Sequence, residues 1–189
     1  MDKTTLRREL LSRRQALSEP RRRAAEDAIL QRLLSRPEWK RSRTVALYYP
    51  VRGEVSLLGL FEHAEGRVLL LPRVEGSELS FCRVNSLQEL VPGAYGIPSP
   101  PCEAASWSPQ DIDLFIVPGV GYSERGHRIG YGGGYYDRVL AKKGNWQMAV
   151  GVAFSCQVLP GIPVEPWDRG VDLVLTEERV IFPATAVWI

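Results

Sequence analysis

The stretch DLFIVPGVGYSERGHRIGYGGGYYDRVL, residues 113–140, decides the fold class of this chain. An apolar run at Leu114–Val117 is followed by a loop, by a glycine-rich turn at residues 130–134 and by a segment with helical potential from Tyr135. Strand, loop, turn and helix in this order are typical of open α/β sheets, whose ligands bind where the carboxyl ends of strands meet helix N-termini. The stretch therefore predicts an α/β fold and a ligand site within it.

The glycine-rich turn has the composition of an anion-binding loop. Gly130, Gly132, Gly133 and Gly134 allow the backbone to approach a ligand closely, and amide groups ahead of a helix can cradle phosphate. The turn lacks the lysine followed by Ser or Thr of a Walker A loop, and Tyr135 stands where a dinucleotide fingerprint has its third glycine. The turn therefore predicts a binding site for nucleotide phosphates, but not for a dinucleotide. The alternative is a turn with a purely structural role.

The residues that flank the turn favour the phosphate interpretation. The guanidinium of Arg128 can pair with two phosphate oxygens, and Asp137, one helical step after the turn, can hold a magnesium ion. Tyr135 and Tyr136 add rings and hydroxyl groups beside the phosphates. Together these groups are typical of a phosphoryl-transfer site, although Asp137 alone could equally be a first-turn helix acid.

Short apolar runs rich in β-forming residues predict further strands on both sides of this stretch. They lie at residues 44–49, 68–71, 79–83, 148–154 and 171–175. Segments with helical potential at 57–64 and 135–142 lie between some of them. Because the runs are apolar throughout, we expect strands covered by helices on both faces. Residues 92–110 carry five prolines and are expected to form a long surface loop.

Two helices are predicted before the first strand. Leucines at helical spacing indicate an amphipathic helix at residues 3–17 with Asp2 as its cap. Ser18 can cap a second helix that has Pro20 in its first turn. The expected fold is a Rossmann-like, three-layer αβα structure with a mostly parallel central sheet, formed by residues 1–189 as a single domain.

Composition excludes several classes of protein. The hydrophobic content of 44% and charged content of 24% are those of a globular protein. No apolar run approaches the roughly 18 residues that cross a bilayer, and the N-terminus is charged where a secretory signal is apolar. The three cysteines show no CxxC spacing, which argues against a zinc site or a disulfide framework. We therefore expect a cytoplasmic protein without membrane partners.

Positive charge is concentrated at the N-terminus. Residues 1–43 contain 13 Lys and Arg against 6 Asp and Glu, although the whole chain has a net charge of only +2. Such asymmetry can indicate a nucleic acid partner, but solvated arginines on helix faces explain it equally well. We favour the second interpretation, with one or two basic residues recruited to a phosphate.

The central stretch resembles the signature of the 5-formyltetrahydrofolate cyclo-ligase family. The resemblance extends over nearly the whole chain and includes KTTLRRELLSRRQAL at 3–17, YYPVRGEV at 48–55, LPRVEG at 71–76, VAFSCQ at 152–157 and PVEPWDRGVDLVLTE at 163–177. Tyr122 stands where the family usually has phenylalanine, and Ser99 where an acidic residue is common. Because of the second departure, no role is assigned to residues 95–100.

The resemblance implies two groups of ATP-binding residues. They are Lys3, Thr4, Thr5, Leu6 and Arg7 at the start of the first helix, and Arg128, Ile129, Gly130, Tyr131, Gly132, Gly133, Gly134, Tyr135 and Tyr136 around the turn. Arg14 is a weaker candidate for the same role. For the helix residues, the alternative is a solvated basic face.

The resemblance also implies a folate pocket and a magnesium site. The folate residues are Tyr49, Glu54, Tyr131, Gly132, Gly133, Gly134 and Tyr135. The Glu54 carboxylate could accept hydrogen bonds from a pterin ring; without the resemblance it would be interpreted as an exposed turn residue. The implied Mg²⁺ ligands are Asp137 and Asp168, whereas Asp172 is expected to be a hydrogen-bonded structural residue.

The implied reaction is the ATP-dependent closure of 5-formyltetrahydrofolate to 5,10-methenyltetrahydrofolate. Arg128 and Asp137 are the expected catalytic residues, and the protein acts by positioning and charge neutralisation without a covalent intermediate on the enzyme. We expect a monomer that binds these small molecules and Mg²⁺ and no nucleic acid. Two alternatives stay open: an RNA-binding protein with an architectural turn, and a kinase or ligase of this architecture with a different acceptor.

Overall fold

A computed structural model describes residues 2–183 and contains an eight-stranded sheet with the order β13-β12-β10-β7-β1-β2-β3-β6. The strands are β1 Thr44–Ala46, β2 Val68–Glu75, β3 Glu78–Arg83, β6 Ser106–Trp107, β7 Leu114–Val117, β10 Met148–Val152, β12 Leu173–Leu175 and β13 Val180–Ile181. The central strands β12, β10, β7, β1 and β2 are parallel, and β13, β3 and β6 pair antiparallel at the edges. The mostly parallel α/β fold predicted from the sequence is confirmed.

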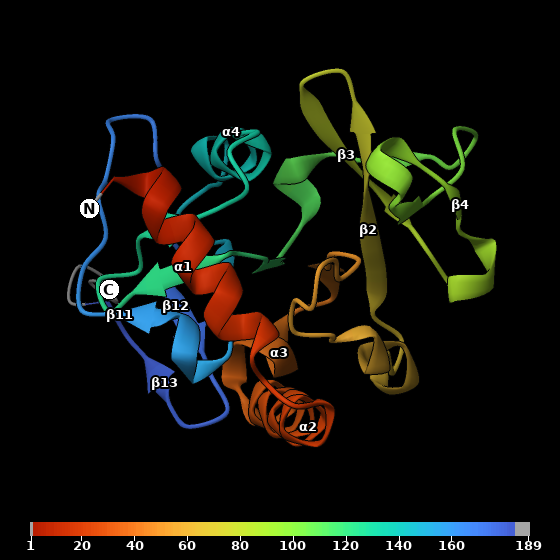
Figure 1. Cartoon of the computed structure of the whole chain (residues 1–189). Coiled ribbons are helices and arrows are strands. Elements are labelled where there is room, and N and C mark those ends of the chain that lie inside the picture. Colours follow the sequence, from red (N-terminus) through yellow and green to blue (C-terminus); the bar gives the residue numbers. More distant parts are fainter. Residues whose placement is uncertain (1, 184–189) are drawn as a thin grey trace.

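Helices cover both faces of this sheet. They are α2 Glu19–Ser35, α3 Pro37–Arg41 and α4 Tyr135–Ala141, whereas α1 Lys3–Gln15 packs elsewhere. In Figure 1, α4 lies on one side of the sheet and α2 and α3 lie on the other. The side chain of Asp2 caps α1, accepting from the amides of Thr4 and Thr5 as expected, whereas Ser18 precedes α2 without a side-chain capping bond. No helix among residues 2–183 is long and apolar enough to cross a membrane.

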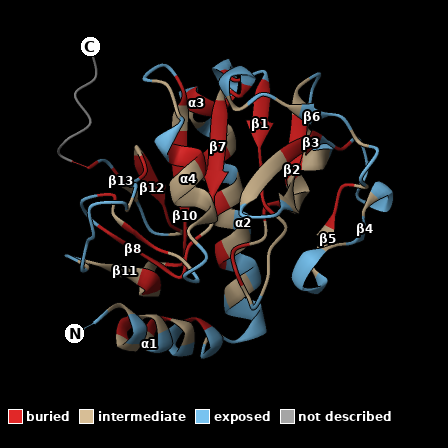
Figure 2. Ribbon diagram, turned by 90° about the horizontal axis from the view of Figure 1, so that it is seen from above, coloured by how far each residue is buried: buried red, intermediate tan, exposed pale blue. Residues whose placement is uncertain are grey.

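The apolar strands follow from this double covering. Val45 of β1 and Leu114 of β7 pack in the cluster under α2 and α3, whereas Ala46 and Phe115 pack in the cluster under α4. Because successive side chains of a strand point to opposite faces, a strand buried on both faces must be apolar throughout. Figure 2 shows these buried strands at the centre of the molecule, with α1 along its outside.

The helix α1 packs against a separate, three-stranded sheet. That sheet has the order β11-β8-β9, with β8 at Gly121–Ser123, β9 at Arg128–Ile129 and β11 at Val158–Leu159. Leu6 and Leu10 of α1 form a small core with Val120 and Ile129. This packing fixes the helix face that carries Lys3, Arg7 and Arg14 beside the glycine-rich turn.

The structure corrects two of the predicted segments. Residues 57–64 include the 3₁₀ helix Leu58–His63, in which i→i+3 hydrogen bonds replace α-helical ones, as is common in short connecting segments. Residues 92–110 are not a plain loop. They include a hairpin of β4 Val91–Pro92 and β5 Pro98–Ser99, and β6, which pairs with β3 at the sheet edge.

Further 3₁₀ turns and one short helix were not predicted. The turns are Leu87–Glu89, Ala94–Gly96, Pro109–Asp111 and Ser155–Gln157, and the helix is α3. Each is shorter than two α-helical turns, so none produces a detectable hydrophobic periodicity. The predicted single domain spans 1–189, and its residues 1 and 184–189 lie outside the described part of the chain.

Gly151 of β10 lies directly against Tyr122. A Cβ atom at residue 151 would lie 2.5 Å from the Tyr122 ring, which is fully buried and held by a 2.6 Å hydrogen bond from its hydroxyl to the Val117 carbonyl. We expect Gly151→Ala to lower the free energy of unfolding by about 1–3 kcal/mol, because a fixed ring cannot yield to the added methyl group. Urea denaturation followed by circular dichroism measures this change.

The matched control is Gly161→Ala. A Cβ atom there meets nothing within 4 Å, and Gly161 has no left-handed φ angle. The free energy of unfolding of Gly161→Ala should therefore stay within about 0.5 kcal/mol of the parent value. Equal denaturation midpoints for Gly151→Ala and Gly161→Ala would contradict the packing described here.

Candidate functional site

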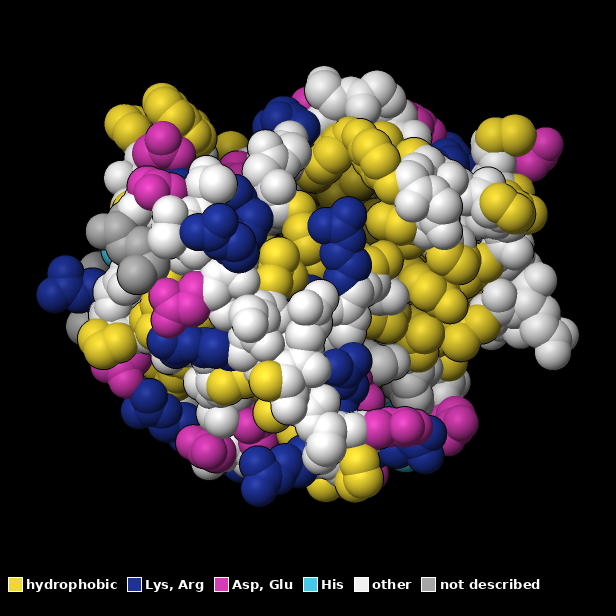
Figure 3. All heavy atoms as spheres, in the orientation of Figure 1, with side chains coloured by type: hydrophobic (Ala, Val, Ile, Leu, Met, Phe, Trp, Pro, Cys, Tyr) yellow, Lys and Arg dark blue, Asp and Glu magenta, His cyan; other side chains and the backbone are white. Residues whose placement is uncertain are grey.

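A cavity of about 790 Å³ opens at the carboxyl ends of β1 and β7. The chain leaves β1 toward β2 and leaves β7 toward β10, on opposite sides, so a crevice forms where the two following loops diverge. Segments from α1, the β2–β3 and β4–β5 hairpins and residues 165–168 complete its walls. Figure 3 shows this face, hollowed and with hydrophobic side chains gathered between the regions of α1 and β2.

The cavity brings together most of the residues predicted from the sequence. Those that line it are Lys3, Arg7, Tyr49, Glu54, Arg128, Ile129, Gly130, Tyr131, Gly132, Gly133, Gly134, Tyr135, Tyr136, Asp137 and Asp168. Thr4, Thr5 and Leu6 are not part of the lining. The Thr5 hydroxyl bonds Asp2 and Leu6 is buried beneath α1, so a contact between these three residues and ATP stays a prediction.

The glycine-rich turn is shaped by close approach and by unusual backbone angles. Gly132 has φ +105° and Gly134 has φ +67°, values that side-chain-bearing residues rarely adopt. A Cβ atom on Gly130 would lie 2.6 Å from the Arg128 guanidinium. Arg7 and Arg138 donate to the carbonyl oxygens of Gly130 and Gly133, each at 2.8 Å. The turn is therefore held from both sides, by α1 and by α4.

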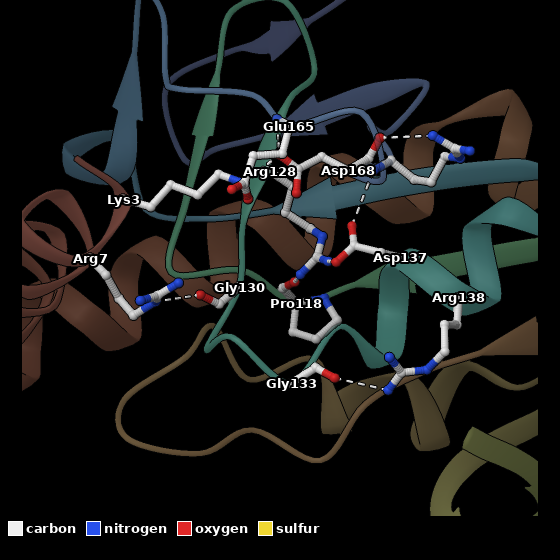
Figure 4. A network of polar contacts seen from close by, with 11 residues as sticks. Lys3, Arg7, Pro118, Arg128, Gly130, Gly133, Asp137, Arg138, Glu165 and Asp168 are labelled. Atoms are coloured by element: carbon white, nitrogen blue, oxygen red, sulfur yellow. Dashed lines mark hydrogen bonds and ion pairs between the residues drawn. The ribbon is translucent and has the colours of Figure 1, made fainter. Parts of the chain in front are cut away.

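Cations and carboxylates alternate at one end of the cavity. Arg128, buried in β9, pairs with Asp137 of α4 at 3.1 Å. Lys3 pairs with Glu165 at 2.5 Å and also with Asp168. Figure 4 shows Arg128 and Asp137 pointing toward each other, with Lys3 and Arg7 approaching from α1. Each acid thus already has a cationic partner.

The contact between Lys3 and Asp168 shifts the pKa of both groups. Burial alone would lower the pKa of Lys3, but its contacts with Asp168 and Glu165 raise it overall. Burial alone would raise the pKa of Asp168, but the hydrogen bonds from Lys3 and from the Glu165 amide lower it overall. Both groups are therefore charged at neutral pH, and a ligand phosphate would meet a fixed ammonium group.

The acids at this end suit a hard cation. Asp137 and Asp168 line the same cavity, and the Asp137 carboxylate also accepts from the Arg169 amide at 3.1 Å. No group of three or more His, Cys, Asp and Glu residues that could hold a metal ion occurs in residues 2–183. Mg²⁺ usually takes one or two protein carboxylates and completes its octahedron with water and phosphate oxygens. The two aspartates fit such a site only together with a bound phosphate.

Glu54 also lines the cavity and is only 5% exposed. Its carboxylate accepts from the Val51 amide at 3.0 Å. Burial raises the pKa of Glu54 to about 7, although that amide, Arg14, Tyr131 and Arg128 oppose the rise. The interpretation as an exposed turn residue is wrong, because the turn that carries Glu54 folds inward beneath the 131–135 segment. A buried acceptor of this kind suits a ligand rich in N–H donors.

Several lining residues were missed by sequence reasoning. Tyr95, to which no role was assigned, lies in the wall, and its hydroxyl is 3.0 Å from that of Tyr135. Trp167 and Glu165 come from the loop before β12 and also line the cavity. No local pattern distinguishes such residues, because the β4–β5 hairpin and the 160s loop reach the site only through tertiary packing. Glu165 could have been suspected from its proximity to Asp168 in PWDRG.

Arg14 does not line the cavity, although the sequence suggested a weak ATP-binding role. Its side chain is fully buried behind the wall, where one nitrogen donates to the Tyr131 hydroxyl at 2.6 Å and to the Arg52 carbonyl at 3.0 Å. Helical spacing alone could not separate Arg14 from Arg13, its exposed neighbour.

Asp172 is structural, as expected. Its carboxylate accepts from the Ala149 amide at 2.7 Å and lies 3.2 Å from the ammonium group of Lys143. It therefore joins β10 to the segment before β12.

Several arginines of the N-terminal region form ion pairs with acids close to them in the sequence. Arg13 pairs with Glu9, Arg23 with Glu19 and Arg36 with Glu38. These pairs favour the interpretation of this region as a set of surface charges with a few cations turned toward the cavity.

Comparison with known proteins adds independent findings. A sequence profile of the 5-formyltetrahydrofolate cyclo-ligase family matches residues 1–177. The chain is 30% identical over 182 residues to the 5-formyltetrahydrofolate cyclo-ligase of Mycoplasma pneumoniae, covering 94% of this chain and 100% of the relative. It is 31% identical over 178 residues to the enzyme of that name from Escherichia coli K12, covering 89% and 96%.

A solved structure agrees in fold as well. The NMR structure of 5,10-methenyltetrahydrofolate synthetase from Aquifex aeolicus matches with a TM-score of 0.88 and 41% sequence identity, covering 100% of this chain and 96% of that one. The resemblance seen in the sequence is thus confirmed over almost all of the molecule, and the chain belongs to the 5-formyltetrahydrofolate cyclo-ligase family.

Proposed function

We propose that this protein catalyses the ATP-dependent cyclisation of 5-formyltetrahydrofolate to 5,10-methenyltetrahydrofolate, with Mg²⁺ as its metal and with ADP and phosphate as products. One observation carries the proposal. A single cavity is lined both by a cation-rich, glycine-rich segment and by a buried carboxylate acceptor. The names of the relatives supply the substrate, and we infer a cytoplasmic monomer without nucleic acid or membrane partners.

The phosphates of ATP are proposed to bind at the glycine-rich end. Lys3, Arg7 and Arg128 line it together with Gly130 and Gly132, whose lack of side chains leaves room for close approach. Lys3 and Arg128 exchange part of their pairing with carboxylates for pairing with phosphate oxygens, which form strong, charge-assisted hydrogen bonds. Fixed cations of this kind stabilise charge on a phosphoryl group during its transfer.

Asp137 and Asp168 are the proposed Mg²⁺ ligands. A divalent cation there would neutralise charge on the β- and γ-phosphates. The ion pair between Asp137 and Arg128 holds this carboxylate in place, so the chain orients the ligand before the metal and nucleotide arrive.

The folate is proposed to bind with its pterin ring between Tyr49, Glu54 and the 131–135 segment. The ionised Glu54 carboxylate accepts hydrogen bonds from pterin N–H groups. The walls formed by Pro72, Val74 and Ile97 supply apolar contacts for the ring. This arrangement points the formyl group toward the phosphate end.

The chemistry needs two bond-forming steps. The formyl oxygen attacks the γ-phosphorus and the bond to ADP breaks, which converts a poor leaving group into a phosphate ester. N10 then attacks the activated carbon, the carbon–oxygen bond breaks with release of phosphate, and N10 loses its proton. The residues of the chain hold the reactants in line and stabilise the transferred charge.

Purified protein with 5-formyltetrahydrofolate and Mg²⁺ should develop the near-ultraviolet band of the methenyl product only when ATP is added. Asp137→Asn should lower kcat by about 100-fold or more, because charge stabilisation at the transferred phosphoryl group is lost. Absorbance measures both effects. Asp27→Asn, on the exposed surface of α2, is the matched control and should retain full activity.

A flat absorbance trace from folded protein that still binds ATP would reject the folate acceptor and favour another small-molecule acceptor. Undiminished activity in Asp137→Asn would reject the metal and catalytic assignment instead.

The value of kcat/KM for 5-formyltetrahydrofolate should rise with pH through about 7, because the pKa of Glu54 is about 7 and its ionised form is the acceptor. Glu54→Gln should flatten this dependence and lower kcat/KM by about 10–100-fold at pH 8, the loss expected for hydrogen bonds to a charged group. Steady-state kinetics from pH 5.5 to 8.5 tests this, with exposed Glu62→Gln as the matched control.

The same group predicts a change in stability. Because the folded-state pKa of Glu54 lies above its usual value, its contribution to stability is present at low pH and is lost as pH rises toward 7. Glu54→Gln should therefore melt at a higher temperature than the parent at pH 8 but not at pH 4. If the pH dependence of kcat/KM were the same in Glu54→Gln as in the parent, a group other than Glu54 would control folate binding.

A further inference from the structure

Arg14 is a charged residue for which the proposed chemistry has no use. It lies in the last turns of α1 and has no exposed surface. Its guanidinium donates to the Tyr131 hydroxyl at 2.6 Å and to the Arg52 carbonyl at 3.0 Å, both from Nη2. It therefore joins α1 to two separate segments of the cavity wall, 131–135 and 51–54.

The second of these segments is the turn that carries Glu54. The turn is closed by the Glu54 amide, which donates to the Val51 carbonyl at 2.9 Å, and by the Val51 amide, which donates to the Glu54 carboxylate. Arg52 has φ +50° and Gly53 has φ +78°, both in the left-handed region. Such a backbone is strained for a residue with a side chain and persists only when its surroundings hold it. The hydrogen bond from Arg14 to the Arg52 carbonyl is one such restraint.

The guanidinium of Arg14 is only partly satisfied. Its Nε and Nη1 atoms are buried and have no hydrogen-bond partner among the described residues. A buried cation without a direct carboxylate partner is costly, and its field acts on the ionisable groups around it. Arg14 favours the charged form of Glu54, and so does the Tyr131 hydroxyl that it holds.

Two cations lie beside the turn that carries Glu54: Arg22 of α2, against Gly53, and Arg52, over the Tyr131 ring. The groups that act on the pKa of Glu54, or on the pKa values of the tyrosines nearest to it, come from several elements. They are Arg14 of α1, Tyr48 after β1, Tyr122 of β8, Arg128 of β9, Tyr131 of the glycine-rich turn and Tyr136 of α4. Burial raises the pKa values of the four tyrosines, so they stay neutral. Arg14 and Arg128 are the two cations of this set, and Arg128 is paired with Asp137.

We propose that Arg14 is a positioning residue of the acceptor pocket, which braces the 51–54 turn and Tyr131 from behind the wall and places a buried positive charge behind Glu54. It acts on the folate end and not on the phosphate end of the cavity. The inference deepens the proposed function and rests on it for the identity of the ligand. The bracing role of Arg14 can be tested without any enzymatic turnover.

The first test is an NMR titration of the ligand-free protein labelled with ¹³C at the glutamate carboxyl carbons. The Glu54 resonance is assigned by its absence from Glu54→Gln. In Arg14→Met, which removes the charge but keeps much of the volume, the Glu54 midpoint should move upward by about one pH unit or more, the usual effect of losing a nearby opposite charge. Arg14→Lys should restore much of the shift. Arg8→Met, the same change at an exposed position of α1, should leave it unchanged.

The second test separates the two ends of the cavity. At pH 6, Arg14→Met should lower kcat/KM for 5-formyltetrahydrofolate by about tenfold, since below both midpoints each pKa unit corresponds to about a tenfold change in the ionised fraction, while KM for ATP changes less than about twofold. A loss expressed mainly in KM for ATP would overturn the proposal, and so would a Glu54 midpoint unaffected by Arg14→Met.

The role of Arg14 can still be decided if Arg14→Met does not fold or if the parent protein is inactive. If Arg14→Met does not fold, Tyr131→Phe removes the hydroxyl that Arg14 holds and should also raise the Glu54 midpoint; an unchanged midpoint there would likewise overturn the proposal. If the parent protein forms no methenyl product, the proposed function fails, but the titration still decides the role of Arg14.

Discussion

The parallel pairing of β1 with β7 is the interaction on which the rest of the structure depends. Val45 lies beside Leu114 and Ala46 beside Phe115, and the chain leaves these neighbouring strands in opposite directions across the sheet. The loops that follow must therefore diverge, and the cavity opens between them. One loop carries Tyr49 and Glu54, the other leads to Arg128 and the glycine-rich turn, so a single pairing brings the two ends of the site together.

The polar groups around this cavity are balanced in pairs before any ligand binds. Arg128 neutralises Asp137 and Lys3 neutralises Asp168, so the glycine-rich end can hold several charges at close range without strong repulsion. The acceptor end is different, because Glu54 is buried and has no direct cationic partner in the described residues. Its charge depends on more distant groups, which makes that end the more sensitive of the two to pH and to remote substitutions.

The sequence was most informative where function depends on local backbone geometry. The glycines at 130–134 and the flanking Arg128 and Asp137 are adjacent in the chain, so their pattern predicted a phosphate-binding turn directly. The same holds for the cap at Asp2, which follows from short-range hydrogen bonding, and for the helix start at Tyr135, which follows the left-handed backbone of Gly134. The apolar runs likewise predicted buried, doubly covered strands, because burial on both faces leaves no position for a polar residue.

The sequence by itself thus determined the α/β class, the central strands, the glycine-rich turn and, through resemblance, the family. Only the tertiary structure decided that Tyr95 and Trp167 join the cavity wall, that Glu54 is buried, and that Arg14 lies behind the wall while Arg13 faces solvent. The reason is physical. Burial and electrostatic environment are set by contacts between segments far apart in the chain, and Arg14 meets Tyr131 across 117 positions of sequence, a separation over which local patterns carry no information.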